Sequence, residues 1–311
     1  MLNNADLILA RRRLTGYLRP TPLEPAPGLG PHTWLKLENA NRTHSFKCRG
    51  ALNAMLALDG AARSRGILAA SSGNHAQGVA LAAHLVGAEA TIVMPAHTPR
   101  RKVDGVRAWG ATPLLVGATY DEAEAAARQM ERDTGKTFIS AYNDPQVIAG
   151  AGTVGLEILD DLTGIQRVIV PVSGGGLISG VGLAMKAINP AIEVIGACSI
   201  ATPALYNWIH GTQHPQQWET LAEALSGEIE AGSITLAISK QVVDRVVLVT
   251  EDAIAEAIRW LAFDTGWIVE GGGAVGVAAL QSGLIPADGK LTAVVVSGGN
   301  IDRETLQRVL G

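Results

Sequence analysis

Short apolar segments rich in β-branched residues recur along the chain and alternate with amphipathic helical segments. The apolar segments are TWLKLE, GILAASS, ATIVMP, ATPLLVG, TFISAY, RVIVPVS, EVIGACS, RVVLVT and LTAVVVSGG. Most are apolar at consecutive positions, which indicates strands covered on both faces. The helical segments between them include HAQGVALAAHLVG, YDEAEAAARQMERDTG and EDAIAEAIRWLAFDTG. The sequence therefore predicts an α/β fold with parallel-rich sheets flanked by helices.

Three of the predicted strand ends carry clusters of polar residues or glycine. In open parallel sheets, ligands bind beyond the carboxyl ends of the strands. The first cluster is AASSGNHAQG (69–78), where one turn holds Ser71, Ser72, Asn74 and His75. A helix N-cap needs only one such side chain. Several polar groups at a helix start suit a bound carboxylate, so we predict that this turn binds one.

The second cluster is PVSGGGLISG (171–180), in which Ser173 and three glycines lead from a buried strand into a helix. Glycines allow several backbone N–H groups to point at one anion, and the helix dipole adds its positive end. No Gly-Lys-Ser/Thr follows, so the segment is not a P-loop. The next strand ends in Cys198 and Ser199 rather than in an acid, which argues against a dinucleotide site. The segment predicts a phosphate site.

The third cluster, VVVSGGNID (294–302), places Ser297 at a strand end, where a hydroxyl can hydrogen-bond a neutral ring nitrogen. A fourth element is Lys47, in NRTHSFKCRGALNAM (41–55). Taken alone, this lysine is most simply a surface charge ahead of a helix. A phosphate site, a carboxylate site and a lysine that can form a Schiff base together indicate pyridoxal phosphate and an amino acid substrate.

Composition excludes several other classes. The net charge is −4 and only 17% of residues are charged, so a nucleic acid partner is not expected. Two cysteines provide neither a disulfide framework nor a zinc spacing, which fits the cytoplasm. The uncharged run 168–185 contains Pro171 and five glycines, so it is divided into strand, turn and helix, and no membrane segment is expected.

These motifs resemble the serine/threonine dehydratase and serine racemase family of fold-type II pyridoxal phosphate enzymes. The matching segments are THSFKCRGA, SSGNHAQGVA, SGGGLISG and SGGNID, with further matches at VIAGAGTVGLEIL and VEGGGAVGVAAL. The resemblance implies a tryptophan synthase β-like fold of two unequal α/β domains with the cofactor in the cleft between them. The large domain would comprise 1–53 and 142–311, and the small mobile domain 54–141. A homodimer is also implied.

The resemblance also assigns roles to residues. Lys47 would form the Schiff base, Phe46 would pack beside the cofactor and Asn74 would hydrogen-bond its 3-hydroxyl. The phosphate would be held by Gly174, Gly175, Gly176 and Leu177, and Ser297 would face the pyridine nitrogen. The substrate carboxylate would be bound by Ser71, Ser72, Asn74 and His75, although a solvent-facing residue at a helix start is the alternative for His75.

The implied reaction is dehydration of a β-hydroxy amino acid to a 2-keto acid and ammonia. Threonine, serine, 3-hydroxyaspartate and phenylserine are candidate substrates. An amino acid (serine) racemase with side dehydratase activity is the nearest alternative, and a non-catalytic α/β ligand-binding protein is a third. Ser72 bears on this choice, because it either acts as a second base, which racemisation needs, or only binds the carboxylate.

Three features depart from the family pattern. His44 stands where glycine is usual, and its role is open. Glu270 is followed by three glycines, which predicts a looser turn there. In the racemase branch the region around 219–236 holds a divalent metal; Glu219 and Glu223 are the candidate ligands here, with a solvated helix face as the alternative. The substrate side chain, the metal dependence and the oligomeric state stay open at this point.

Overall fold

The structure, a computed structural model, describes residues 2–311, and the chain divides into two compact units. The first unit contains the residues up to Arg19 together with Phe46–Ala151, and the second contains Pro20–Ser45 and Gly152–Gly311. The predicted small domain, 54–141, lies within the first unit. Its boundaries and its mobility remain predictions.

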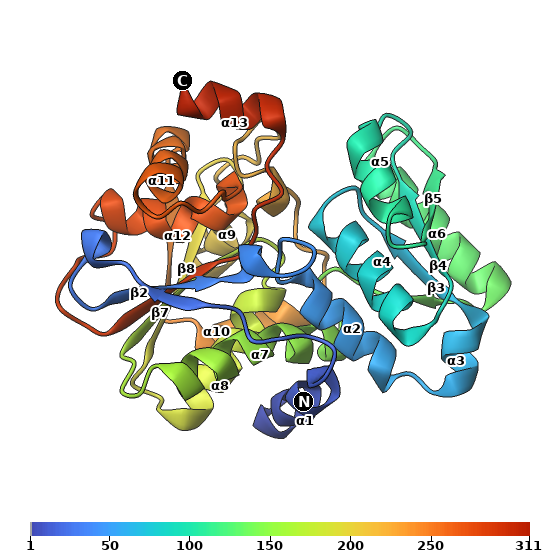
Figure 1. Cartoon of the computed structure of the whole chain (residues 1–311), viewed down its shortest axis with the longest axis horizontal. Coiled ribbons are helices and arrows are strands. Elements are labelled where there is room, and N and C mark those ends of the chain that lie inside the picture. Colours follow the sequence, from blue (N-terminus) through green and yellow to red (C-terminus); the bar gives the residue numbers. More distant parts are fainter. Residues whose placement is uncertain (1) are drawn as a thin grey trace. The chain divides into compact units, whose positions relative to one another are not determined.

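The first unit is built on a parallel sheet with the strand order β5-β4-β3-β6, within the described part of the chain (Figure 1). Its strands are β3 (Ile67–Ala70), β4 (Ala90–Met94), β5 (Thr112–Leu115) and β6 (Thr137–Phe138). Its helices are α1 (Asn4–Leu14), α2 (Lys47–Ala57), α3 (Gly60–Arg65), α4 (Asn74–Val86), α5 (Arg100–Arg107) and α6 (Tyr120–Thr134), followed by the first part of α7 (Pro145–Asp161).

Local sequence signals set the ends of these helices. The side chain of Thr119 accepts a hydrogen bond from the backbone N–H of Glu122 at the start of α6, and acidic residues in the first turn complement the helix dipole. The helix ends at Gly135, which has a left-handed conformation with φ +67°. A left-handed residue at this position closes a helix at little steric cost when it is glycine.

The second unit is built on a sheet with the order β1-β2-β10-β7-β8-β9, in which only the β1–β2 pair is antiparallel among the described residues. Its strands are β1 (Leu23–Pro25), β2 (Thr33–Leu37), β7 (Arg167–Pro171), β8 (Glu193–Ser199), β9 (Arg245–Val249) and β10 (Thr292–Val296). Its α-helices are α8 (Gly176–Ile188), α9 (Ala204–His210), α10 (Ile234–Val242), α11 (Glu251–Asp264), α12 (Gly271–Gln281) and α13 (Arg303–Leu310). Three short 3₁₀ helices, Pro27–Leu29, Glu38–Ala40 and Glu223–Leu225, complete the described elements.

The central strands explain why the apolar segments are continuous. Every residue of β7 and of β10 is buried, and β10 pairs in parallel with β2 on one side and β7 on the other. Helices such as α12, which contacts β7, β8 and β10, cover the sheet (Figure 1). The predicted fold class, α/β with parallel-rich sheets flanked by helices, is confirmed.

The predicted elements differ from the observed ones mainly in length. The segment TFISAY contributes only the two residues of β6, because Ser140 then accepts hydrogen bonds from the backbone N–H groups of Tyr142 and Asn143 and turns the chain. Within residues 2–311 no helix is both long and apolar enough to cross a membrane.

Candidate active site

Lys47 is the first residue of α2 and its side chain is half-buried. Its Nζ donates a hydrogen bond to the carbonyl oxygen of Ala141 at 2.9 Å. The same Nζ lies 5.1 Å from the centroid of the Phe46 ring, within the range of a cation–π contact. The interpretation of Lys47 as an ordinary surface charge is therefore wrong.

Helix α4 lies close against the backbone of Lys47. A Cβ atom placed on Gly78 would lie 2.9 Å from the carbonyl carbon of Lys47 and 3.0 Å from the backbone nitrogen of Cys48. Real Cβ atoms essentially never come so close to backbone atoms, so only glycine fits here. The contact fixes where α2 begins and thus where the lysine side chain starts.

The first polar strand end lies between β3 and α4. The N-cap residue of α4 is Gly73, and no side chain caps the helix. Ser71 Oγ instead accepts a hydrogen bond from the backbone N–H of Gly73 at 3.2 Å. Ser71, Ser72 and Asn74 are partly exposed. An ordinary serine or asparagine N-cap therefore does not explain this polar cluster, and the start of a helix of 13 residues is a favourable place for a carboxylate.

His75 differs from its neighbours because its side chain points inward. It is 3% exposed, and its Nε2 lies 2.9 Å from the carbonyl oxygen of Ile139. The alternative interpretation, a residue facing solvent at a helix start, is wrong. Nε2 is committed to the backbone and Nδ1 is buried, so any contact of this residue with a substrate carboxylate would come from its backbone N–H.

The glycine loop of the second unit forms the turn between β7 and α8. Gly175 has φ +83° and is the N-cap residue of α8, and no side chain caps this helix. Thr235 Oγ1 donates a hydrogen bond to the carbonyl oxygen of Gly174 at 2.7 Å, and a Cβ on Gly175 would lie 3.1 Å from the Thr235 Cβ. The loop thus combines a left-handed glycine with the positive end of a helix of 13 residues. These features fit a phosphate group.

Ser297 follows the last residue of β10 and is 5% exposed. The segment after it is joined to the loop that precedes Phe46. The backbone N–H of Gly299 donates to the carbonyl oxygen of His44 at 2.9 Å. Asn300 Nδ2 donates to the carbonyl oxygen of Thr43, also at 2.9 Å. Segments more than 250 residues apart in sequence therefore lie side by side in the second unit.

His44 has φ +54° and is the one non-glycine residue with a positive φ among residues 2–311. This conformation is costly for a residue with a Cβ, which explains why glycine suits the position. The backbone N–H of His44 donates to Asn41 O at 2.8 Å, and its carbonyl is held as described above. The imidazole Nδ1 lies 3.4 Å from the carbonyl oxygen of Asn39, a long contact that glycine would lose, whereas glycine would keep both backbone hydrogen bonds.

Replacing His44 by glycine is expected to raise the free energy of unfolding by about 0.5–1 kcal/mol. Relief of the left-handed strain, worth about 1–2 kcal/mol, outweighs the added entropy of the unfolded chain. Urea unfolding of the two proteins measures the difference. His97→Gly, at an exposed position without positive φ, is the matched control and should lower stability. A destabilised His44→Gly protein would contradict the strain assigned to His44.

The three glycines after Glu270 do not form a loosened turn, so that prediction is wrong. Gly271 is the first residue of α12, and all three glycines are buried. A Cβ on Gly273 would lie 2.5 Å from the carbonyl oxygen of Gly298, and one on Gly271 would overlap the carbonyl of Leu221. Gly273 is needed because the helix passes very close to the backbone that follows Ser297, and Gly271 because the helix passes very close to the backbone of Leu221.

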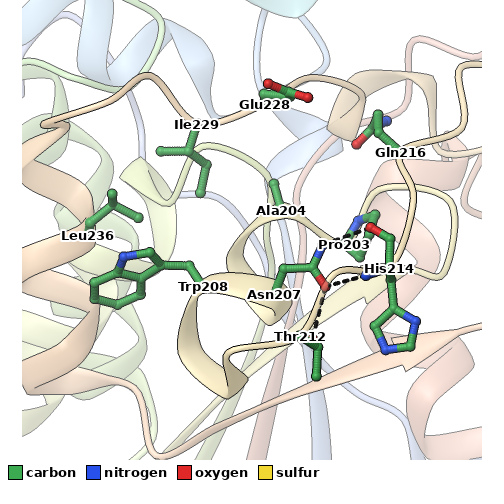
Figure 2. A pocket seen from close by; sticks show the side chains of 10 residues that line it. All are labelled: Pro203, Ala204, Asn207, Trp208, Thr212, His214, Gln216, Glu228, Ile229 and Leu236. Atoms are coloured by element: carbon green, nitrogen blue, oxygen red, sulfur yellow. Dashed lines mark hydrogen bonds between the residues drawn. The ribbon is translucent and has the colours of Figure 1, made fainter.

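The predicted metal ligands do not gather into a site. Glu219 and Glu223 are both exposed, and no group of three or more His, Cys, Asp or Glu side chains that could hold a metal ion exists in the part of the chain that the structure describes. Figure 2 shows a pocket beside α9, which Glu228, Trp208 and Ile229 help to line. None of the predicted site residues lines it.

Comparison with known proteins gives consistent matches over almost the whole chain. The family model described as "Pyridoxal-phosphate dependent enzyme" matches residues 14–298. The chain is 42% identical to L-threonine ammonia-lyase of Thermotoga maritima over 316 residues, covering 100% of this chain and 78% of that protein. It is 37% identical to L-threonine dehydratase catabolic TdcB of Escherichia coli, covering 98% and 95%.

Solved structures agree with these matches. Maize serine racemase superposes with a TM-score of 0.92 at 33% identity, over 98% of this chain and 96% of that one. The processed form of threonine deaminase isoform 2 from Solanum lycopersicum gives a TM-score of 0.89 at 34% identity, over 98% and 85%. The predicted resemblance and the predicted fold-type II architecture are confirmed.

Proposed function

We propose, from the premise that this chain belongs to the family of pyridoxal-phosphate dependent enzymes, that it is a dehydratase of β-hydroxy amino acids. It would convert threonine, serine or a related compound to a 2-keto acid and ammonia. The main support for the proposal is that Lys47 is the first residue of α2 and directly follows Phe46. Relatives named L-threonine ammonia-lyase and L-threonine dehydratase, aligned over 98–100% of the chain, support the substrate class.

The residues present fit pyridoxal phosphate. Lys47 would form the Schiff base, Phe46 would lie beside the ring and Asn74 would hydrogen-bond the 3-hydroxyl. The loop Gly174–Leu177 would hold the phosphate, in agreement with the left-handed Gly175 and the start of α8, and Ser297 would face the ring nitrogen. When bound, the cofactor withdraws electrons from the substrate Cα and so weakens its C–H bond.

Each protein group then has a separate task. The ε-amine of Lys47 would act as the general base that accepts the α-proton of the substrate. Ser71, Ser72 and Asn74, with the backbone N–H groups at the start of α4, bind the substrate carboxylate and orient the Cα–H bond toward the lysine. Ser297 offers a neutral hydroxyl to the ring nitrogen and, unlike an aspartate, does not hold a proton there.

A racemase is the second candidate, and one observation favours it. Ser72 is partly exposed and does not cap α4, so its hydroxyl is available to move a proton on the substrate face opposite the lysine. The similarity to maize serine racemase supports this possibility. Racemisation requires such a second base, whereas dehydration requires one base, Lys47, and a proton donor that lets the β-hydroxyl leave as water.

A substrate panel separates the two activities. L-threonine, L-serine, 3-hydroxyaspartate and phenylserine are incubated with the enzyme, and the keto acid and the D-enantiomer are assayed separately. We expect keto acid as the main product of at least one of these compounds. If Ser72 is a second base, Ser72→Ala lowers D-enantiomer formation by about 10²-fold, while Ser64→Ala, on exposed α3, changes neither product. Absence of keto acid from every substrate would refute the dehydratase proposal.

The proposed setting is a cytoplasmic homodimer. Cys48 and Cys198 are buried and form no disulfide, which suits a reducing compartment. The homodimer rests on the family resemblance, and sedimentation velocity of the purified protein tests it. The proposed small domain, 54–141, would move as one body during turnover, as lids and domains of enzymes commonly do.

A further inference from the structure

His75 is a neutral side chain in the interior of the first unit. It is the second residue of α4 and is 97% buried, with 3% of its surface exposed. Burial, and then the positive charge of Lys47, lower the pKa of its imidazole to about 3. The ring is therefore uncharged at neutral pH. It neither pairs with a carboxylate as a cation nor donates a proton as an acid under those conditions.

One hydrogen bond determines which ring nitrogen carries the proton. Nε2 lies 2.9 Å from the carbonyl oxygen of Ile139, and a carbonyl only accepts, so Nε2 is the donor. Nδ1 is then an acceptor, and it is buried without a hydrogen-bond partner among the residues that the structure describes. A buried acceptor without a partner is destabilising, because it has lost its hydrogen bond to water. An apolar side chain of similar size would leave no acceptor unpaired. The histidine therefore makes its Nε2 hydrogen bond at the expense of a buried, unpaired Nδ1.

The carbonyl that His75 holds belongs to a short segment that also holds Lys47. The backbone N–H of Ile139 donates to Leu68 O at 2.8 Å, which ties this residue to the sheet beside β3. Two residues later, the carbonyl oxygen of Ala141 accepts the hydrogen bond from Lys47 Nζ at 2.9 Å. His75 therefore acts on the segment at the point where the chain leaves the sheet and turns toward the lysine amine.

We propose that His75 is a positioning residue for Lys47. Its Nε2–H holds the Ile139 carbonyl, which fixes the direction of the chain into Ala141 and so places the Ala141 carbonyl where Lys47 Nζ binds it. That carbonyl retains the amine near its working position whenever the amine is not bonded to the cofactor. The uncharged ring also adds no second cation beside the lysine. This inference rests on the proposed role of Lys47.

Two variants of the holoenzyme test the role of the hydrogen bond. His75→Gln keeps an N–H donor at a similar reach, whereas His75→Leu has a similar volume and no donor. Kinetics and a pH titration of the visible absorption band of the bound cofactor are measured for both. We expect His75→Leu to lower kcat by on the order of tenfold or more, with KM within about threefold, and to shift the midpoint of the titration. His75→Gln should recover most of kcat and the wild-type midpoint. Equal behaviour of the two variants would overturn the proposal.

A measurement on the wild-type protein tests the proposal even if one of the variants does not fold. ¹⁵N NMR of the wild-type holoenzyme should show His75 as a neutral imidazole protonated at Nε2. A ring protonated at Nδ1 alone, or an imidazolium at neutral pH, would overturn the proposal without any substitution.

Lys47→Ala separates this inference from the proposed function. If Lys47→Ala retains the visible band, the assignment of the Schiff-base lysine fails, and the positioning role fails with it. If Lys47→Ala loses the band while His75→Leu behaves like His75→Gln, only the positioning role of His75 is refuted.

Discussion

Replacing Lys47 by alanine is expected to lower kcat for the preferred β-hydroxy amino acid by about 10⁴-fold or more, because the substitution removes both the covalent partner of the cofactor and the base that takes the α-proton. The visible absorption band of the purified protein should disappear as well. Absorbance spectra and a keto acid assay measure the two losses. The fold should survive, because the half-buried side chain is at the first residue of α2 and caps nothing.

Two controls make the Lys47 result specific. Lys240→Ala removes an exposed lysine from α10 and should leave both the band and kcat unchanged. Lys47→Arg keeps the positive charge and the length of the side chain, but a guanidinium does not form a stable Schiff base and does not lose its proton near neutral pH. It should therefore be nearly as inactive as the alanine variant. An active Lys47→Arg enzyme would show that only a positive charge is needed here.

Gly78→Ala is expected to have the second largest effect, although the residue carries no functional group. The new Cβ would lie 2.9 Å from the Lys47 carbonyl carbon, so α2 and α4 must move apart. Overpacking of this kind costs about 1–3 kcal/mol of stability. Because Lys47 moves with α2, kcat should fall by on the order of tenfold or more. Urea unfolding and steady-state kinetics measure the two effects.

Gly60→Ala is the matched control for this substitution. A Cβ on Gly60, the first residue of α3, would meet no atom within 4 Å, and its φ is not positive. Alanine there should be neutral or slightly stabilising. If Gly78→Ala were as stable and as active as Gly60→Ala, the close approach of α4 to Lys47 would matter neither for stability nor for activity.

Strands and candidate binding segments could be predicted from the sequence for the same physical reason. A strand buried on both faces requires consecutive apolar residues, and β7, β8 and β10 all have them. The carboxyl ends of such strands are where backbone and polar side chains become available. Ser71, Gly175 and Ser297 could therefore be identified before their surroundings were known.

The partners of those residues could not be predicted. The acceptor for Lys47 Nζ is the backbone carbonyl of Ala141, and every residue has a carbonyl, so nothing in the sequence marks this one. Thr235 bonds Gly174 from 61 residues away, and nothing in the sequence around it indicates that partner. The burial of His75 follows from the packing of α4 against the sheet, whereas its polarity alone suggests exposure.

The pairing of β2 with β10 has a consequence for the order in which the chain can acquire its structure during synthesis. Thr33 is in register with Thr292, and Leu37 with Val296. The first unit needs no residue beyond Ala151, so all of its parts are available once that residue has been made. Strand β2, by contrast, gains its parallel neighbour only after β10, at residues 292–296, has been made. Until then, β1 or chaperones must shield the apolar residues of β2 from water.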